Sequence, residues 1–124
     1  MIGGYEDNIH KDIEFHNFDC SDFSKVKKIM KSIDVVYHCA ATAHEGLSVF
    51  SPYEITKNNY LASVSIFSAA VNEKVKRIIF CSSMARYGDQ QTPFTEDMAP
   101  KPVDPYGISK VAAEDVLKLS LIHI

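Results

Sequence analysis

The sequence has no long apolar run. No uninterrupted apolar segment approaches the roughly 20 residues that a helix needs to cross a bilayer. The first fifteen residues, MIGGYEDNIHKDIEF, contain no apolar core of the kind that a secretory signal peptide carries. We therefore expect a soluble, cytoplasmic protein with no membrane partner.

A cationic surface is missing as well. Thirteen Lys and Arg against sixteen Asp and Glu give a formal net charge of −3, and the sequence contains no basic stripe that could follow a row of phosphates. A nucleic-acid partner is therefore not expected. The apolar content of 46% in 124 residues is ordinary for one globular domain.

Cysteines with metal-ligand spacing are also absent. The three cysteines, Cys20, Cys39 and Cys81, lack CxxC spacing, and the five histidines are scattered along the chain, so we expect no metal site. The number of cysteines is odd and each follows an apolar run. This pattern favours buried free thiols in a reducing compartment.

What the sequence does contain is an alternation of strand-like and helix-like segments. Residues 13–18 alternate apolar and polar with period two, and short runs rich in strand-forming residues follow at 33–39 and 75–81. Each run is followed by a helical pattern with apolar residues three or four apart. The expected helices begin after the polar run 19–22, at about residue 58, and near Tyr106. This alternation predicts an α/β fold built on a parallel sheet.

Residues of unusual composition stand where the expected strands end. They are Asp19–Cys20 after the first run, the small residues from Cys39 to Ala43 after the second, and Ser82–Ser83 after the third. Ligands of parallel sheets bind beyond the carboxyl ends of the strands. We therefore expect the functional site at this edge of the sheet.

A tyrosine and a lysine four residues apart form the most informative chemical motif. On a helix, Tyr106 and Lys110 share one face, so a phenol and an ammonium group can reach the same ligand. The positive charge stabilises a phenolate, which lets the tyrosine act as a base near neutral pH. Tyr53 and Lys57 have the same spacing. Because Tyr106, unlike Tyr53, follows a serine at a strand end, Ser83, we interpret the Tyr53–Lys57 match as incidental.

Two segments carry a specific resemblance to a known family. The run IFCSSMARYG, residues 79–88, and the run PYGISKVAAED, residues 105–115, resemble the extended short-chain dehydrogenases, the family of NAD-dependent epimerases and dehydratases. Three further segments resemble the same family: the strand end at 34–41, Asn59 ahead of a pair of alanines, and the aspartate turn at 18–22. The five segments follow the family's order over about residues 13–118.

The resemblance implies a catalytic role for three side chains. Tyr106 is expected to be the general base that takes the proton of a sugar hydroxyl. Lys110 is expected to hold the nicotinamide ribose and to support Tyr106, and Ser83 to hydrogen-bond the reacting oxygen. The implied substrate is a nucleotide sugar.

The cofactor that the resemblance implies is NAD. Asp19 is expected to accept a hydrogen bond from the adenine amino group with the Cys20 backbone beside it, and Asn59 to brace the nicotinamide side. Small residues are expected to line the ribose and phosphates, since they permit close approach of the backbone. These are Cys39, Ala40, Ala41 and Ala43, and Tyr106 and Lys110 complete the implied cofactor site.

The residues after the third expected strand favour an epimerase within the family. The family's 4,6-dehydratases resemble Thr-Asp-Glu at this point, whereas this chain has Ser83, Met84 and Ala85. Methionine and alanine cannot move protons, so elimination of water lacks its acid and its base. We therefore expect a nucleotide-sugar epimerase, with a UDP-sugar 4-epimerase preferred. A sugar reductase or dehydrogenase of the same family uses the same three residues and remains the alternative.

The family's opening motif, a strand followed by Gly-x-x-Gly-x-x-Gly and a helix, has no counterpart in this chain. Gly3–Gly4 lacks the third glycine and a preceding strand. We expect residues 1–124 to be a fragment of a single NAD-binding Rossmann-like domain: a partial parallel sheet with helices on both faces, with the first βαβ unit and the C-terminal substrate domain largely missing. The longer protein is expected to be a homodimer, and the isolated fragment inactive.

Two further expectations concern the limits of the chain. The final run, residues 119–124, resembles translated sequencing-adapter sequence, and we expect it not to be native. A non-catalytic remnant that binds NAD is a second functional hypothesis. The presence of Ser83, Tyr106 and Lys110 favours the enzyme, because a protein that merely binds has no use for a base.

Overall fold

The structure is a computed structural model that describes residues 5–122. It begins with a 3-10 turn, η1 (Glu6–Asn8), and a segment of loops and turns that leads to helix α1 (Phe23–Ile29). Asp22 caps α1, since its carboxylate accepts a hydrogen bond of 3.3 Å from the Lys25 backbone N–H. The helix predicted after residues 19–22 is confirmed.

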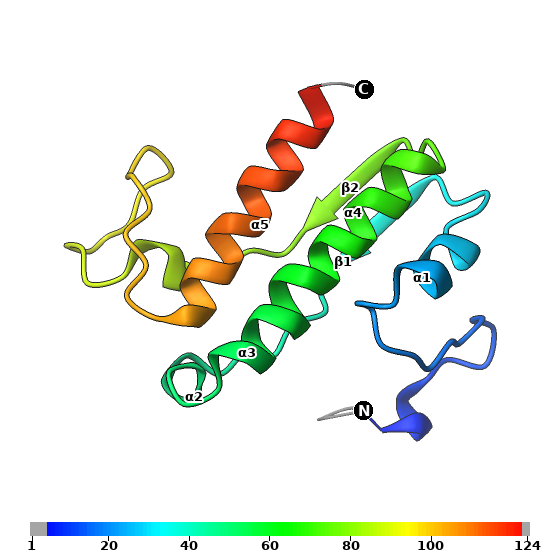
Figure 1. Ribbon diagram of the computed structural model, residues 1–124, viewed down its shortest axis with the longest axis horizontal. Helices are drawn as coiled ribbons and strands as arrows, with labels where there is room; N and C mark the ends of the chain where they lie inside the picture. The colour runs from blue at the N-terminus through cyan, green and yellow to red at the C-terminus, as the bar shows by residue number, and fades with distance from the viewer. Residues whose placement is uncertain (1–4, 123–124) are drawn as a thin grey trace.

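Two parallel strands form the sheet of the described chain, β1 (Val35–His38) and β2 (Arg77–Phe80). Their register pairs Val35 with Arg77 and His38 with Phe80. Each strand lies inside a run that the sequence predicts, 33–39 and 75–81. In Figure 1 the helical segment that connects the two strands runs in front of β1.

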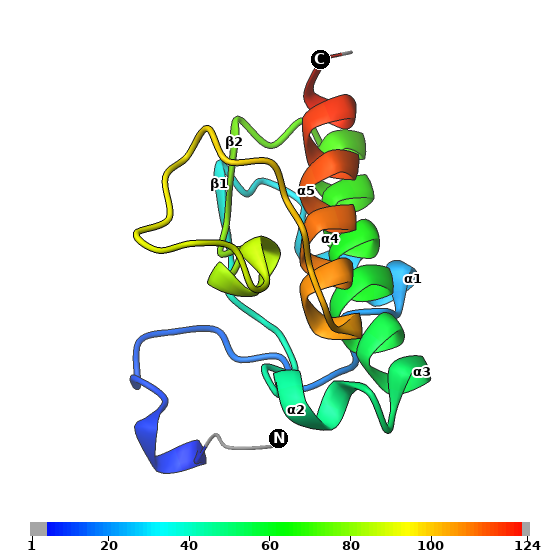
Figure 2. The ribbon, with the colours of Figure 1, turned by 90° about the vertical axis from the view of Figure 1, so that its left-hand side faces the viewer.

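One face of the sheet is covered by helices and the other is open. His38 is 2% exposed, whereas its neighbour Tyr37 is 70% exposed, as expected for side chains that alternate across a strand. Figure 2 shows α4 (Ala62–Asn72) and α5 (Pro105–Ile122) together on one side of β1 and β2. The α/β fold and the parallel sheet are confirmed. The second layer of helices that we also expected on the opposite face is not formed by residues 5–122.

The connection from β1 to β2 contains one long, interrupted helix. After the short helix α2 (Glu45–Ser48), α3 (Pro52–Ile55) continues into a π-helical segment, η2 (Thr56–Leu61), and then into α4. The helix begins at Pro52 rather than at the expected residue 58. Proline at the first position of a helix costs no hydrogen bond, and its fixed φ angle suits the first turn.

The hydrophobic core lies between α1, α4, α5 and the covered face of the sheet. Phe67 is its largest apolar side chain, and its ring meets those of His38 and Phe80 edge to face at 5.7 and 5.5 Å. Ala69, Ala70 and Ala113 are buried in the same cluster. Their small side chains allow α4 and α5 to approach each other closely.

Residues 13–18 do not form the strand that their alternation predicts. They have no regular secondary structure, and β1 and β2 pair with each other in the described sheet while neither pairs with this segment. Alternation supplies the side-chain pattern of a strand, whereas a ladder also needs a neighbouring backbone to share its hydrogen bonds. Gly3–Gly4 and residues 123 and 124 of the final run lie outside the described residues.

Helix α5 begins where the proline and the tyrosine predict. The Asp104 side chain accepts a hydrogen bond of 2.7 Å from the Gly107 backbone N–H, and this contact caps the helix behind Pro105. Within the described chain, no helix combines the length and the apolar character that crossing a bilayer requires.

Candidate active site

Several residues that the sequence analysis predicts for the site lie near the carboxyl ends of β1 and β2. The register continues one residue past the strands, because the Cys81 N–H donates to the His38 carbonyl oxygen at 3.1 Å. Residues 39–43 therefore leave β1 beside Ser82–Ser83, which leave β2. Helix α5 brings Tyr106 and Lys110 to the same end.

Lys110 is held at the end of β2 with little contact with solvent. Lys110 is 4% exposed, and its Nζ donates a hydrogen bond of 2.8 Å to the Cys81 carbonyl oxygen. The same nitrogen lies 4.9 Å from the centre of the Phe80 ring and 5.9 Å from that of Tyr106. Burial lowers the pKa of Lys110 from the ordinary lysine value. The ammonium group is thus positioned to stabilise negative charge near the tyrosine.

The two Tyr-x-x-x-Lys matches lie in contrasting environments. Tyr106 is 5% exposed, whereas Tyr53 is 74% exposed on α3. Lys57 is engaged elsewhere, because its Nζ lies 3.0 Å from the Asp19 carboxylate. Tyr106 and Lys110 are thus both buried and adjacent, whereas Tyr53 is exposed and its lysine belongs to a surface ion pair. These surroundings favour the interpretation of Tyr53–Lys57 as incidental.

A close backbone approach links Ser83 to the start of α5. Ser83 precedes a 3-10 turn, η3 (Met84–Tyr87), and its Oγ accepts a hydrogen bond of 3.2 Å from the Ala85 N–H. A Cβ on Gly107 would lie 2.7 Å from the Ala85 carbonyl oxygen. Glycine at this position lets the first turn of α5 pack directly on η3, the turn that follows Ser83. Gly107 lies within the run 105–115, but the sequence pattern alone does not indicate this contact.

A second link joins the end of β2 to α5 through Glu114, a residue that was not among the predicted site residues. The Ser82 hydroxyl donates to one Glu114 carboxylate oxygen, and the Arg86 guanidinium lies 3.2 Å from the other. The side chains of Glu114 and Arg86 are only 13% and 19% exposed. Glu114 follows Lys110 by four residues, on the face that Tyr106 and Lys110 already occupy. This spacing is the signal that could have revealed it.

Asn59 fixes the segment that follows β1. It is buried in the π-helical part of the long helix, and its side chain accepts from the Thr42 N–H at 2.7 Å and donates to the Thr42 carbonyl oxygen at 3.2 Å. Asn58 adds a hydrogen bond of 3.2 Å to the Thr42 hydroxyl. Asn59 thus positions the backbone of residues 39–43, and any support that it gives the nicotinamide stays a prediction.

A buried histidine lies beneath this segment. The Nε2 of His38 is 2.8 Å from the Ser63 Oγ, and the Ser63 hydroxyl donates to the Asn59 carbonyl oxygen at 2.5 Å. With the serine proton engaged, Nε2 of His38 is the donor in this pair. Burial, with a smaller contribution from the Lys110 charge, lowers the pKa of His38 from the ordinary histidine value of 6.5 to about 4. His38 is therefore neutral at physiological pH.

This histidine gives the fold a testable pH dependence. Between pH 6.5 and pH 4, His38 is protonated in the unfolded chain but stays neutral in the folded chain. The free energy of unfolding therefore falls as the pH drops through this window. When the pH is lowered from 7 to 5, we expect the free energy of unfolding of His38→Gln to fall by about 2 kcal/mol less than that of the parent, as measured by urea unfolding. The exposed His44→Gln variant is the control and should behave as the parent. Equal losses in the parent and in His38→Gln would contradict the assignment.

The expected adenine contact, Asp19, has protein partners in this structure. One carboxylate oxygen accepts from the N–H and the hydroxyl of Ser21, each at 2.8 Å, and the other lies 3.0 Å from Lys57. These contacts, the Ser21 N–H first, lower the pKa of Asp19 to about 2. Asp19 is thus ionised and still half exposed.

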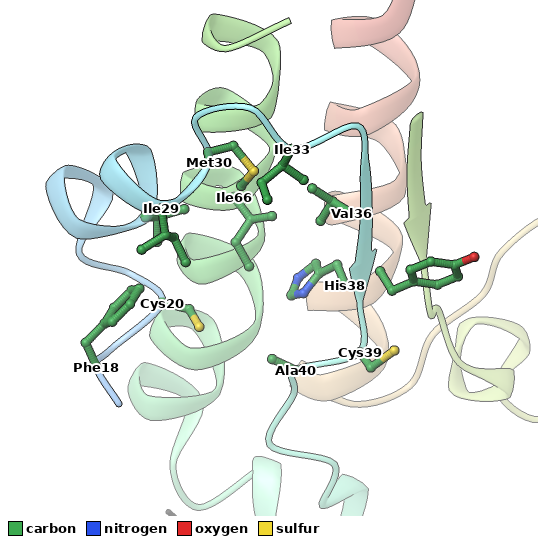
Figure 3. Close-up of a pocket in the computed structure, with 12 residues that line it drawn as sticks. Phe18, Cys20, Ile29, Met30, Ile33, Val36, His38, Cys39, Ala40 and Ile66 are labelled. Carbon is green, nitrogen blue, oxygen red and sulfur yellow. The ribbon is translucent and has the colours of Figure 1, made fainter. Parts of the chain in front are cut away.

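Three of the expected cofactor residues line one pocket. Cys20, Cys39 and Ala40 border an apolar cavity of about 300 Å³ between the segment before α1 and the edge of β1. Figure 3 shows Cys20 and Ala40 pointing toward it, with Phe18 and Ile29 on the far side. Ala40, Ala41 and Ala43 are exposed. Side chains of this size leave the backbone after β1 open to a ligand.

The environment of the cysteines corrects one expectation. All three are free thiols, as predicted, and Cys20 is partly buried, where burial raises the pKa of its thiol. Cys39 and Cys81, however, are exposed rather than buried. Both come one residue after a strand and lie on its open face, a placement that an apolar run in the sequence does not reveal. Across residues 5–122 no three His, Cys, Asp or Glu side chains gather as metal ligands.

Comparison with known proteins decides the family. The family model described as "NAD dependent epimerase/dehydratase family" matches residues 4–120. The chain belongs to this family. Its members are enzymes, and NAD is the cofactor that the family uses.

Individual relatives agree with this membership. The UDP-glucose 4-epimerase of Lactobacillus helveticus is 32% identical over 120 residues, which are 94% of this chain and 36% of that protein. The UDP-glucose 4-epimerase of Thermotoga maritima, solved with UDP-glucose, superposes with a TM-score of 0.92 at 27% identity, over 98% of this chain and 41% of that one. The UDP-glucose 4-epimerase of Brucella ovis, solved with NAD, gives 0.83 at 31% identity, over 88% and 34%. The chain thus spans about a third of the length of the curated relatives it matches.

Proposed function

We propose that the protein that carries this chain is a nucleotide-sugar epimerase that inverts carbon 4 of a UDP-sugar. The observation that supports this most directly is the buried Tyr106–Lys110 pair at the end of β2, next to the turn that follows Ser83. The 4-epimerases to which the chain is similar supply the substrate class.

The residues present fit NAD as the cofactor. The exposed alanines after β1 leave room for ribose and phosphate against the backbone, and Asn59 holds that backbone in place. Lys110 has one ammonium hydrogen engaged by the Cys81 carbonyl oxygen and keeps others for the ribose hydroxyls. When bound, NAD supplies a reversible acceptor for the hydride of the sugar carbon.

The proton chemistry falls to the chain's own side chains. Tyr106 takes the proton of the sugar hydroxyl while the adjacent carbon–hydrogen bond breaks. It returns the proton after the oxidised sugar has rotated in the site, so that the hydride returns to the opposite face of carbon 4. The Lys110 ammonium stabilises the negative charge that develops on the phenol. Ser83 donates a hydrogen bond to the sugar oxygen, and the close approach of Gly107 to Ala85 sets the turn that follows Ser83 against the helix turn that carries Tyr106.

The turn η3 argues against elimination of water. Its first two residues are Met84, which is 70% exposed, and Ala85, and neither can accept or donate a proton. A dehydratase needs an acid and a base in addition to the tyrosine. An epimerase needs no further group, because it returns the hydride that it removed. A reductase of the family uses the same three residues and is the second candidate.

The test is a product assay on the natural protein that carries this chain. UDP-galactose, incubated with the purified protein and NAD, should convert to UDP-glucose without net formation of NADH, measured by chromatography of the sugars and by nicotinamide absorbance. Stoichiometric NADH formation would instead identify a dehydrogenase. Binding of NAD without conversion of any UDP-sugar would identify a protein that only binds the cofactor.

A further inference from the structure

The ends of β1 and β2 carry two thiols on neighbouring strands. The register pairs His38 with Phe80, so the next residues, Cys39 and Cys81, stand opposite each other. Their Sγ atoms are 3.5 Å apart, and both residues are exposed. We propose that Cys39 and Cys81 are a dithiol that oxidises to an intramolecular disulfide at the carboxyl edge of the sheet.

The backbone geometry permits this bond without rearrangement of the sheet. Adjacent strands lie about 4.8 Å apart, within the range of roughly 4.4–6.8 Å between Cα atoms that disulfides span. The hydrogen bond from the Cys81 N–H to the His38 carbonyl oxygen keeps this register at the last pair. Figure 3 shows the Cys39 side chain on the opposite side of β1 from His38. This is the side that the helices leave open, so an oxidant can reach the sulfur atoms.

Proximity, rather than thiol acidity, favours the reaction. The neighbouring Cys81 raises the pKa of the Cys39 thiol, so the first attack on an oxidant is not accelerated. Once one sulfur is oxidised, the second thiol stands next to it, and the closing step is intramolecular. Cys20, on the segment before α1, has no such partner among residues 5–122 and serves as the internal reference.

The chemistry balances with a peroxide as the oxidant. One thiolate attacks hydrogen peroxide, which forms a sulfenic acid and releases the first water after proton transfer. The second thiolate then attacks that sulfur, the S–S bond forms, and the hydroxyl leaves with a proton as the second water. Two thiols lose two electrons and two protons in all, and a dithiol reductant reverses the step.

The bond would join the two segments that carry the candidate site. Cys39 precedes Ala40 and Ala41, and Cys81 precedes Ser82 and Ser83. The Cys81 carbonyl oxygen is also the acceptor for the Lys110 ammonium. The proposed disulfide therefore lies within two residues of Ala40, Ala41 and Ser83, although its formation does not depend on the proposed enzymatic function.

The experiment is oxidation of the full chain with hydrogen peroxide, followed by thiol titration and peptide mapping by mass spectrometry. The three free thiols should fall to one, with a Cys39–Cys81 crosslink, and dithiothreitol should restore all three. Cys20→Ser should still lose two thiols, whereas Cys39→Ser and Cys81→Ser should form no intramolecular crosslink.

The same oxidation in urea shows whether the fold directs the pairing. The unfolded chain should give a mixture of crosslinks that involves Cys20. If the chain without urea gives that same mixture, or forms disulfides between molecules in preference to the Cys39–Cys81 bond, the proposal is wrong.

Discussion

Replacing Tyr106 by phenylalanine is expected to lower the kcat of epimerisation by about 10²–10⁴-fold, the usual contribution of a general acid–base group. The substitution removes only the phenol oxygen and keeps the ring that fills this 5% exposed position. The fold and the binding of the nucleotide sugar should therefore change little. The measurement is the initial rate on UDP-galactose in the natural protein that carries this chain, together with KM for the sugar.

Tyr53→Phe is the matched control, because Tyr53 also stands four residues before a lysine. Its ring is 74% exposed and its lysine pairs with Asp19, so we expect kcat to stay within about twofold of the parent. A Tyr106→Phe protein with full activity would disprove the role of Tyr106 as the base. Equal losses in the two variants would disprove the distinction between the motifs.

Replacing Phe67 by alanine is expected to lower the free energy of unfolding by about 3–5 kcal/mol. Phe67 is 1% exposed, and its ring contacts those of His38 and Phe80 across the interface between α4 and the sheet. The truncation removes apolar area from the core and leaves a cavity that the surrounding rings cannot close. Small domains have only about 5–15 kcal/mol of stability in total, so the loss should be visible in urea unfolding followed by circular dichroism.

Phe50→Ala provides the control of equal chemistry at the surface. Phe50 is 82% exposed, and we expect its truncation to change the unfolding free energy by no more than about 0.5 kcal/mol. Phe67→Leu keeps most of the volume and should cost less than Phe67→Ala. Similar effects of Phe50→Ala and Phe67→Ala would mean that the helices do not pack on this face of the sheet as described.

Local sequence chemistry was sufficient for the elements whose signals lie within a few residues. The runs 33–39 and 75–81 are rich in strand-forming residues and contain β1 and β2. Pro105 and the capping side chain of Asp104 define the start of α5. These signals predict the elements correctly because backbone angles and helix caps depend on residues that are neighbours along the chain.

Strand pairing and the solvent exposure of side chains could not be predicted from the sequence in the same way. Residues 13–18 have the alternation of a strand, but whether a strand forms depends on a neighbouring backbone. Cys39 and Cys81 follow apolar runs, and their exposure depends on which face of the sheet the helices cover. Both properties are set by segments distant in the sequence.

By itself, the sequence determined the fold class, the family and the candidate base with its lysine, since these rest on residue types at fixed spacing. The tertiary structure alone decided which Tyr-x-x-x-Lys pair is buried, and it set the turn that follows Ser83 against the first turn of α5 through the close approach of Gly107 to Ala85. It also joined Glu114 to Ser82 and Arg86 and placed Cys39 beside Cys81. Spacing along a helix fixes which side chains share a face, but only the packing of that helix against the sheet determines what this face meets.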